Sequence, residues 1–333
     1  MIKPLLITLS FLSIACTKEL DVDLPGAPPQ IVVNGLLHPD STIRISLTTT
    51  LSSSVNSIDF PVVNNAVVRL YEDGQSIGNL SFRDSTYVLD YQPIIGREYR
   101  VEVDAPGYPT VRASDVVPNP PKVEICFRED IEDRYQFRSG ILEIVIYDPP
   151  TEDNFYWFYD ITYSYQDRFC ERKNGTFECR EVDPPVLTPS ELGFYYSFSP
   201  IPDRFNAFVD NTTGGVTQFD FYIRVDDAIK NGEQIAFDIA SGDGWTNREE
   251  FFSESFYDGF FGTLYTISGS QHYDRYLKSS ITYLLNRDYS TDEDLGFKPF
   301  VQFSQVYSNV ENGMGIFAAY NTTDLDIGSY PCK

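Results

Sequence analysis

Between residues 31 and 117, apolar and polar positions alternate with a period of two, as they do in half-buried β-strands. Turn-forming dipeptides such as Asp73-Gly74 and Pro106-Gly107 separate the apolar runs. The predicted strands cover residues 31–33, 43–47, 67–71, 87–89 and 99–103. Because several short strands at this spacing are typical of a sandwich, we predict an immunoglobulin-like β-sandwich over residues 31–118, which ends at a proline-rich segment.

The chain continues with β-type patterns after this boundary. Further strands are predicted over residues 141–147, 155–165, 219–225 and 234–239. Alternate positions of the segment 155–165 form an aromatic stripe, made of Phe155, Trp157, Tyr159, Ile161, Tyr163 and Tyr165. We interpret this stripe as part of a hydrophobic core. The alternative is an exposed platform on which sugar rings stack.

One segment departs from the period of two. Between residues 272 and 289 the apolar positions fall near helical spacing. They are Tyr273, Tyr276, Leu277, Ile281, Leu284 and Leu285. We therefore predict a larger β-rich domain over residues 119–333 with one long helix near 272–289, in a protein that is mainly β.

The first sixteen residues, MIKPLLITLSFLSIAC, have the pattern of a secretory signal. Their apolar run is shorter than the roughly 20 residues that a membrane-spanning helix needs. Small Ala15 precedes Cys16, which resembles the cleavage point of a bacterial lipoprotein, so residues 1–15 would be removed and Cys16 acylated. Ser13 stands where leucine is commonest in such signals. The alternative is a secreted protein with a chance cysteine.

The sequence is strongly acidic, with 25 Lys+Arg against 49 Asp+Glu and a formal net charge of −24. A charge of this sign argues against nucleic acid as a partner, because nucleic-acid binding needs a basic surface. It also repels anionic bilayers, so we expect membrane attachment through the lipid at Cys16. Residues 16–30 are acidic and then rich in proline and glycine, which predicts an extended tether.

The acidic composition raises the alternative of a calcium site. Acidic clusters at residues 129–133 and 292–294 offer the hard oxygen ligands that calcium prefers. Neither cluster has the spacing of a calcium loop, with its glycine and terminal glutamate, so a solubilising acidic surface is the alternative. The chain has two histidines and no Cys-x-x-Cys motif, which argues against zinc. We predict no cofactor.

The cysteines predict two disulfides. Four remain after lipidation of Cys16, and an even number in an exported chain indicates disulfide bonding. Asn174-Gly175 is a strong signal for a two-residue hairpin turn. Such a turn pairs Cys170 with Cys179 at a non-hydrogen-bonded position, where side chains approach most closely. Cys126 and Cys332 are then left as the second pair.

No catalytic signature is present. The sequence lacks Gly-x-Ser-x-Gly, Walker, Gly-x-Gly-x-x-Gly and His-Glu-x-x-His motifs. The two histidines, His38 and His272, are predicted to be ordinary surface residues. A glycosidase needs only two carboxylates, but nothing in the sequence selects a pair. We therefore predict no catalytic residue and no enzymatic activity.

Three motifs carry a resemblance to a known family. They are the mature start at residues 16–25 followed by 31–35, the segment Tyr273-Asp-Arg-Tyr276-Leu277, and a terminal motif in which Asn309 precedes Gly313-Met-Gly315-Ile-Phe317. This combination resembles Bacteroidota outer-membrane lipoproteins of the domain-of-unknown-function 4249 family, over the whole mature chain. The family has no assigned catalytic residues. The terminal motif is therefore interpreted as structural, a tight turn that needs positive φ.

The resemblance also implies a location and a partner. Such lipoproteins are typically encoded beside TonB-dependent receptors, which implies an outer-membrane anchor and a barrel nearby. Acidic Glu19, Asp21 and Asp23 agree with display on the cell exterior. We expect an accessory protein that docks on a TonB-dependent barrel and assists substrate capture or gating. The alternatives are a surface hydrolase of glycans or peptides and a structural component of an envelope-assembly complex.

Two shorter resemblances concern the first domain. Residues 96–101 and 105–109 resemble carboxypeptidase-regulatory-like sandwiches, which are binding or spacer modules. Asp40-Ser41 and Asp84-Ser85 each precede threonine and match the short Asp-(Ser/Thr)-x signal for O-glycosylation in the same group of bacteria. Ser41 and Ser85 are therefore predicted glycosylation sites.

Overall fold

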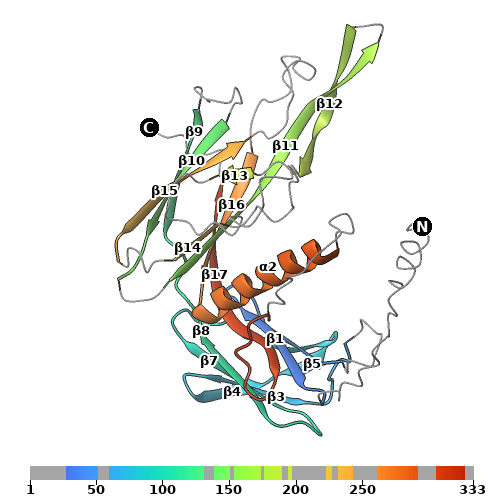
Figure 1. Cartoon of the computed structure of the whole chain (residues 1–333), viewed down its shortest axis with the longest axis vertical. Coiled ribbons are helices and arrows are strands. Elements are labelled where there is room, and N and C mark those ends of the chain that lie inside the picture. The colour runs from blue at the N-terminus through green and yellow to red at the C-terminus, as the bar shows by residue number, and fades with distance from the viewer. Residues whose placement is uncertain are drawn as a thin grey trace, which may run out of the picture.

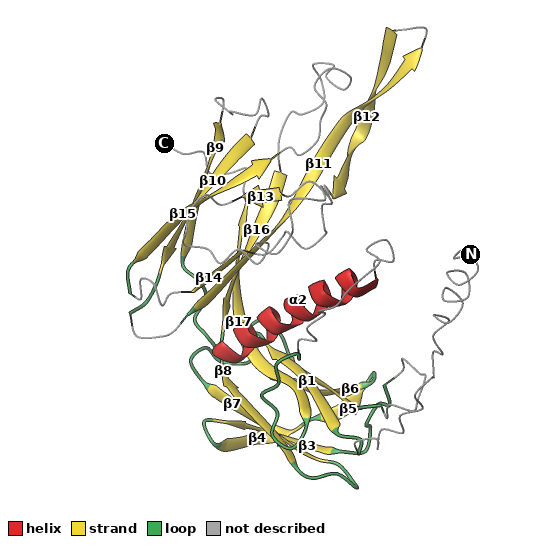
Figure 2. Ribbon diagram, in the orientation of Figure 1, coloured by secondary structure: helices red, strands yellow, loops and turns green. Residues whose placement is uncertain are grey.

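A computed structural model describes residues 28–51, 60–130, 139–150, 154–173, 176–189, 194–196, 223–226, 232–242, 261–291 and 305–326. These residues form two β bodies that follow one another along the long axis of the molecule (Figure 1). Helix α2 (Gln271–Thr291) lies across their junction, as the ribbon coloured by secondary structure shows (Figure 2). The predictions of a mainly β fold and of one long helix near residues 272–289 are confirmed.

The first body is the predicted sandwich. One of its layers contains four strands in the order β1-β2-β6-β5, and the other has the order β4-β3-β7-β8. The bounds are β1 Ile31–Leu37, β2 Ile43–Thr49, β3 Val67–Glu72, β4 Gln75–Asn79, β5 Ser81–Arg83, β6 Thr86–Leu89, β7 Glu98–Asp104 and β8 Val111–Val116. All five strands predicted between residues 31 and 103 lie within these elements.

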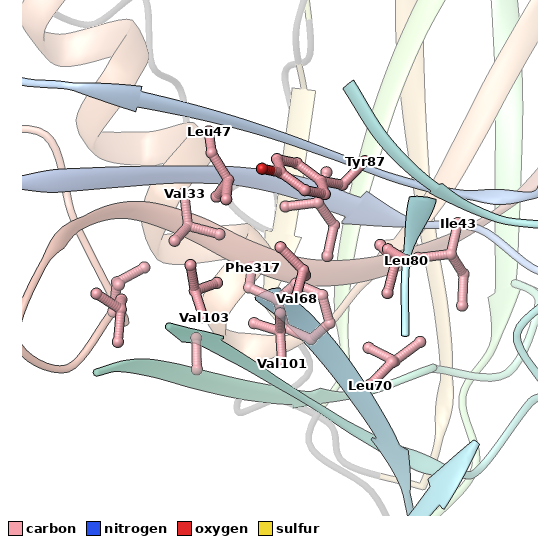
Figure 3. Packing of buried hydrophobic residues seen from close by; sticks show 14 of the residues in the cluster. Val33, Ile43, Leu47, Val68, Leu70, Leu80, Tyr87, Val101, Val103 and Phe317 are labelled. Carbon is pink, nitrogen blue, oxygen red and sulfur yellow. The ribbon is translucent and has the colours of Figure 1, made fainter. Parts of the chain in front are cut away.

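The core of the first body lies between its two layers. Alternate residues of the strands point inward, so that Val33 of β1 and Val101 of β7 are completely buried. Figure 3 shows aliphatic side chains from both layers meeting around Phe317. Phe317 belongs to the last described strand, so one large core residue comes from the far end of the sequence.

That strand, β17 (Met314–Asp326), belongs to both bodies. Residues 314–319 pair with β1 in parallel, and residues 320–326 pair antiparallel with β16 (Phe261–Gly269) of the second body. The division of the chain into residues 31–118 and 119–333 remains a prediction. The structure adds that the last strand completes the core of the first sandwich.

The second body contains two packed sheets. One has the order β13-β15-β10-β9, and the other continues the long sheet through β16, β11 and β12, with β14 also pairing with β11. The bounds are β9 Val123–Asp130, β10 Ser139–Tyr147, β11 Phe155–Lys173, β12 Thr176–Pro189, β13 Phe194–Tyr196, β14 Ile223–Asp226 and β15 Gln234–Gly242. The strands predicted at 141–147, 155–165 and 234–239 lie in β10, β11 and β15. Of the segment 219–225, residues 219–222 lie outside the described residues.

Both faces are buried at the start of β11, and not only the face that carries the aromatic stripe. Trp157, a stripe residue, is completely buried against α2 and β17. Its neighbours Tyr156 and Phe158 point the other way and are equally buried in the core of the second body. The start of β11 is therefore covered on both faces. The stripe side chains from Tyr159 onward lie outside the described part.

Helix α2 begins at a serine cap. The Tyr273 N–H donates to Ser270 Oγ at 3.1 Å, and the Asp274 N–H donates to the Ser270 carbonyl at 2.9 Å. The first of these bonds satisfies one of the amide groups that every helix leaves free at its start, and the second is the first hydrogen bond of the helix itself. Tyr273 and Ile281 are buried against the sheet, as their spacing predicts. Within the described residues, no helix has both the length and the apolar character needed to cross a membrane.

Candidate interaction arm and its junction

The most prominent feature outside the two packed bodies is a β-hairpin, which we call the arm and define as residues 164–173 of β11 and 176–189 of β12. β11 pairs with β16 only as far as Tyr163. Beyond that residue its one neighbour among the described residues is β12. The arm therefore extends from the second body as a two-stranded ribbon, at the top of Figure 1. Ten residues of extended strand reach about 30 Å.

The register of the arm matches the register predicted from Asn174-Gly175. Lys173 lies opposite Thr176, and three steps further down Cys170 lies opposite Cys179. The two cysteine positions are thus directly paired across the ribbon. The disulfide between them stays a prediction, because their side chains lie outside the described part.

The arm is divided by an irregularity. Gln166 pairs with Val186 and Arg168 pairs with Glu181, so four residues of β12 lie opposite one residue of β11. The four include Pro184 and Pro185, which lack the N–H that a continuous ladder needs. The break separates a short base from a distal ribbon of six pairs, residues 168–173 with 176–181. This break in the pairing could have been predicted from the dipeptide Pro184-Pro185.

The arm and the start of β1 lie at opposite ends of the molecule. β17 runs parallel to β1, and both β17 and β11 run antiparallel to β16, so β1 and β11 point in the same direction. β1 starts at Ile31, and β11 ends at Lys173. The 7 residues of β1 and the 19 of β11 follow one another along this direction, which corresponds to a length on the order of 80 Å.

The remaining cysteine predictions are only partly covered by the described residues. Cys126 of β9 is disulfide-bonded. Its predicted partner, Cys332, lies outside the described residues, so this pairing stays a prediction. Cys16 and the tether at residues 16–27 lie outside them as well, and lipidation is likewise untested.

The junction between the two bodies is organised by Asp115, near the end of β8. Its carboxylate accepts hydrogen bonds from the Ala319 N–H at 2.7 Å, from the Val116 N–H at 3.0 Å and from the Ser270 hydroxyl. One side chain of the first sandwich thus binds both β17 and the residue that caps α2. Burial raises the pKa of Asp115 to about 7, although the hydrogen bonds act in the opposite direction.

A buried ion pair joins α2 to β14. Arg224 of β14 donates from Nε to Asp274 Oδ1 at 2.6 Å and from Nη2 to Asp274 Oδ2 at 3.0 Å. Trp157 Nε1 also donates to Asp274 at 3.0 Å. Burial lowers the pKa of Arg224, but the hydrogen bond and charge of Asp274 outweigh it, so the pKa lies above its ordinary value. Such a bidentate pair fixes the first turn of α2 on the second body.

The terminal family motif ties β17 to the first sandwich. Asn309 donates from Nδ2 to the Phe317 carbonyl at 2.7 Å and to the Ser114 carbonyl at 3.3 Å, and its Oδ1 accepts the Phe317 N–H at 3.0 Å. Phe317 itself is completely buried. Asn309 thus bonds to both β8 and β17, and the interpretation of the motif as structural stays a prediction.

The two glycines of the motif allow β17 to approach β1. Gly315 has φ +104°, and a Cβ there would lie 2.0 Å from the Val33 carbonyl oxygen. A Cβ on Gly313 would lie 2.7 Å from the Ile31 carbonyl oxygen. Gly315 therefore needs a conformation that L-residues rarely adopt, whereas Gly313 is needed for close backbone contact.

The two histidines lie beside the junction. His38 Nε2 is 3.1 Å from Thr322 Oγ1, and its ring lies 5.0 Å from that of Tyr320. His272 Nδ1 is 2.7 Å from Tyr307 Oη, and burial together with Arg275 lowers the pKa of His272. Both are part-buried, so the prediction of ordinary surface residues is too simple. Their partners are structural tyrosines and a threonine.

The predicted glycosylation sites lie on exposed turns of the first sandwich. Ser41 follows β1 in the turn that leads to β2, and Ser85 lies in the turn between β5 and β6, with φ +63°. Both residues are exposed. Their modification stays a prediction.

The acidic clusters considered for calcium are largely outside the described residues. Glu129 and Asp130 are described only as backbone at the end of β9, and residues 131–133 and 292–294 are not described. Among the described side chains, no group of three or more His, Cys, Asp or Glu residues is arranged to hold a metal ion.

Comparison with solved structures finds two forms of Salmonella α2-macroglobulin. The methylamine-reacted protein has 10% sequence identity and a TM-score of 0.23, covering 95% of this chain and 16% of its own. A point mutant has 10% identity and a TM-score of 0.21, covering 96% and 16%. Similarity at this level carries no argument about fold or function, and the chain spans under one fifth of those proteins.

Comparison by sequence is more informative. No curated protein matches the chain. One family profile matches residues 17–326, which includes β1, the tyrosine-bearing start of α2 and the Asn309 motif on β17. The chain therefore belongs to the family described as Domain of unknown function (DUF4249).

Proposed function

We propose that this protein is a lipid-anchored accessory of the bacterial outer membrane, displayed on the cell exterior, which docks on a TonB-dependent barrel and assists substrate capture or gating. The anchor is Cys16, and residues 16–30 form the tether. Docking rather than catalysis is the main activity in this proposal. No catalytic motif is present in the sequence, and the family has no assigned chemistry.

The arm is the observation that carries the proposal. A two-stranded ribbon without further neighbours is at best marginally stable in water. The distal ribbon has six register pairs and a directly opposed cysteine pair. It lies beyond the last residue at which β11 pairs with β16. An element that costs chain order and extends past the neighbouring strand of its sheet is suited to a contact outside the molecule.

The position of the tether supports the same role. The tether joins β1, a central strand that has β2 on one side and β17 on the other. A pulling force on the anchor would therefore act on the hydrogen bonds that join β1 to β2 and to β17. A body attached through a central strand at one end, with a projecting hairpin at the other, suits a protein that bridges its anchor and a partner.

Affinity purification of the tagged full chain, at native expression, tests the proposal. We expect a TonB-dependent barrel to be recovered from detergent-solubilised outer membranes. A variant lacking residues 168–181, closed by an Asn-Gly turn, should lose the barrel while keeping its membrane attachment. Repeated recovery of the protein alone would contradict the proposal, as would turnover of a glycan or peptide library by the purified protein.

The anchor is tested separately. Cys16→Ser should leave the protein unprocessed or soluble, because the acyl chains then have no attachment point. Protease treatment of intact cells should cleave the wild-type protein. Normal processing of the variant, or complete protection of the wild type, would contradict the anchor or its outward orientation respectively.

A further inference from the structure

Large apolar side chains are exposed near the point where the chain enters the first sandwich. Phe60 is 57% exposed, Val62 is 48% exposed and Val67 is 43% exposed. Single exposed apolar residues are ordinary on a protein surface. The meaning of these three therefore depends on whether they lie together and on what surrounds them.

They lie at one end of the first sandwich, which we call the entry end. β1 begins there at Ile31, opposite Thr49 at the end of β2. The Thr49 N–H donates to the Pro61 carbonyl at 3.0 Å. This bond places Phe60 and Val62 beside the start of β1.

The second layer of the sandwich reaches the same end. β3 begins at Val67, opposite Asp104 at the end of β7. A Cβ on Gly313 would lie 2.7 Å from the Ile31 carbonyl oxygen and 3.0 Å from Cγ1 of Val111, at the start of β8. The starts of β1 and β8 are therefore adjacent. The three exposed apolar side chains thus come from both layers and share one end of the body.

The entry end is also poor in charge. No Asp, Glu, Lys or Arg occurs in three described segments that lie there, residues 28–31, 60–67 and 105–110, although 22% of the chain is charged. Asp104 and Glu311 lie beside these segments, and each has an arginine next to it. Asp104 pairs with Arg69, and Glu311 lies opposite Arg112. Anionic headgroups repel this end less than they repel the acidic remainder of the molecule.

The position of the anchor indicates which surface the entry end faces. The Gln30 carbonyl accepts a hydrogen bond from the Thr50 N–H at 2.9 Å, so the chain leading back to Cys16 leaves the sandwich at this end. Fully extended, residues 16–30 span about 45 Å. Acylation of Cys16 therefore keeps the entry end within about 45 Å of the bilayer, with its apolar side chains on the side from which the anchor comes.

We infer that the entry end is a membrane-contacting surface, and that Phe60, Val62 and Val67 enter the lipid bilayer to which the protein is anchored. Apolar side chains of peripheral proteins lie in the same way at the boundary between headgroups and acyl chains. The contact adds to the attachment by the acyl chains and restrains the orientation of the anchored protein. The inference rests on the anchor in the proposed function and names the surface that faces the membrane.

Quenching by brominated lipid tests the contact, because bromine on an acyl chain quenches a fluorophore only at short range. The acylated full chain carries a fluorescent amino acid at Phe60 and is reconstituted in zwitterionic phosphatidylcholine vesicles with brominated acyl chains. A second protein carries it at Ile95, which is 41% exposed in a turn whose Gly96 N–H bonds to Val117, after the far end of β8. We expect quenching that is about fivefold or more stronger at position 60 than at position 95.

Two double variants separate the entry end from the general effect of removing exposed apolar groups. Val62→Ser/Val67→Ser changes the entry end. Ile94→Ser/Val116→Ser changes two residues of similar exposure, 48% and 46%, at the opposite end of the sandwich. We expect the first variant to lower quenching at position 60 about threefold or more, and the second to change it less than about 1.5-fold. Circular dichroism should show that both variants keep the fold, since all four side chains are exposed.

Other outcomes overturn the inference. Equal quenching at positions 60 and 95 would do so, as would unchanged quenching in Val62→Ser/Val67→Ser. A photo-crosslink in cells from position 60 to an outer-membrane protein would assign the entry end to a protein partner. Sedimentation as a dimer that Val62→Ser/Val67→Ser dissociates would assign it to a second copy of this chain.

The inference and the proposed function can fail separately. If the acylated protein attaches to the vesicles without quenching at position 60, the anchor stands and the membrane-contacting surface fails. If Cys16→Ser is processed normally and stays in the membrane fraction, the anchor at Cys16 fails. Quenching at position 60 in that variant would then show that the entry end contacts lipid without it.

Discussion

The two ends of the molecule, one containing β1 and the other the arm, are held in different ways. At the β1 end, a second sheet covers one face, α2 lies against the neighbouring strand β17, and residues such as Val33 and Phe317 are completely buried. At the β11 end, the arm has one neighbouring strand among the described residues. The first end is stabilised by burial, while the second is described only as a pair of strands, β11 and β12, with a predicted disulfide between them. Changes at the first end should therefore unfold the protein, and changes at the second should affect the arm alone.

Gly315→Ala should give the largest effect at the buried end. The new Cβ would lie 2.0 Å from the Val33 carbonyl oxygen, and the backbone is held at φ +104°. Since β17 cannot then pair with β1, we expect a loss of more than about 4 kcal/mol in the free energy of unfolding. Chemical denaturation followed by tryptophan fluorescence measures it.

Gly74→Ala is the matched control for this substitution. Gly74 also has positive φ, +81°, but a Cβ there meets nothing within 4 Å. Backbone strain alone predicts a loss of about 1–2 kcal/mol. Equal losses for the two variants would show that the close approach of β17 to β1 does not matter.

Asp274→Ala should give the next largest effect. It leaves Arg224, whose side chain is 3% exposed, without its bidentate carboxylate. Removing one partner of a buried ion pair costs about 3–5 kcal/mol. Calorimetry of the full chain should show this loss. Asp90→Ala breaks the exposed pair between Asp90 and Arg83 and should cost under about 1 kcal/mol. A similar value for Asp274→Ala would mean that α2 is not fixed by this pair.

Features that depend on residues close together in the sequence were predicted correctly, and features that depend on distant residues were not. Strand periodicity and the Asn174-Gly175 turn signal are local, so the five strands of the first sandwich and the register that places Cys170 opposite Cys179 agree with the structure. The parallel pairing of β17 with β1 joins residues that lie more than 270 positions apart. No local pattern encodes such a pairing, and the closure of the first core by Phe317 was therefore not predicted.

The junction was missed for a related reason. Asp115 is in phase with Val111 and Ala113 along β8, and all three are buried. A carboxylate is unexpected on the buried face of a strand, and here β17 and the start of α2 cover it and supply its hydrogen bonds. These partners come from tertiary packing, which single-sequence periodicity does not contain.

Cys170→Ser/Cys179→Ser should produce a moderate effect confined to the arm. A disulfide that closes so short a loop contributes about 2–3 kcal/mol in the chain-entropy model. Residues 168–181 lie beyond the last pairing of β11 with β16, so their opening should not unfold the rest. Hydrogen exchange should show faster exchange of residues 168–181, with an unchanged melting temperature for the two bodies. A drop in the melting temperature of the whole protein would remove the contrast between the two ends.

Asp115→Asn should change the free energy of unfolding least. The pH dependence of that change reports the ionisation of Asp115. The pKa of Asp115 rises from an ordinary 3.8 to about 7 in the folded protein, mainly through burial. A carboxyl group with a raised folded pKa favours the folded state fully below pH 3.8, and this contribution is lost as the pH rises to about 7. The free energy of unfolding should therefore fall by about 1 kcal/mol between pH 6 and pH 8 because of this group.

The amide introduced by Asp115→Asn carries no charge, so the variant should lack this fall. Its oxygen can still accept from the Ala319 N–H and the Ser270 hydroxyl, while its NH₂ group faces the Val116 N–H and loses one hydrogen bond. That loss is a constant cost of about 1 kcal/mol at every pH. His272, with a lowered pKa, titrates in both proteins and cancels in their difference. Denaturation curves of both proteins from pH 6 to pH 8 should therefore converge as the pH rises. Parallel curves would show that Asp115 is ionised throughout, and that its three hydrogen bonds outweigh its burial.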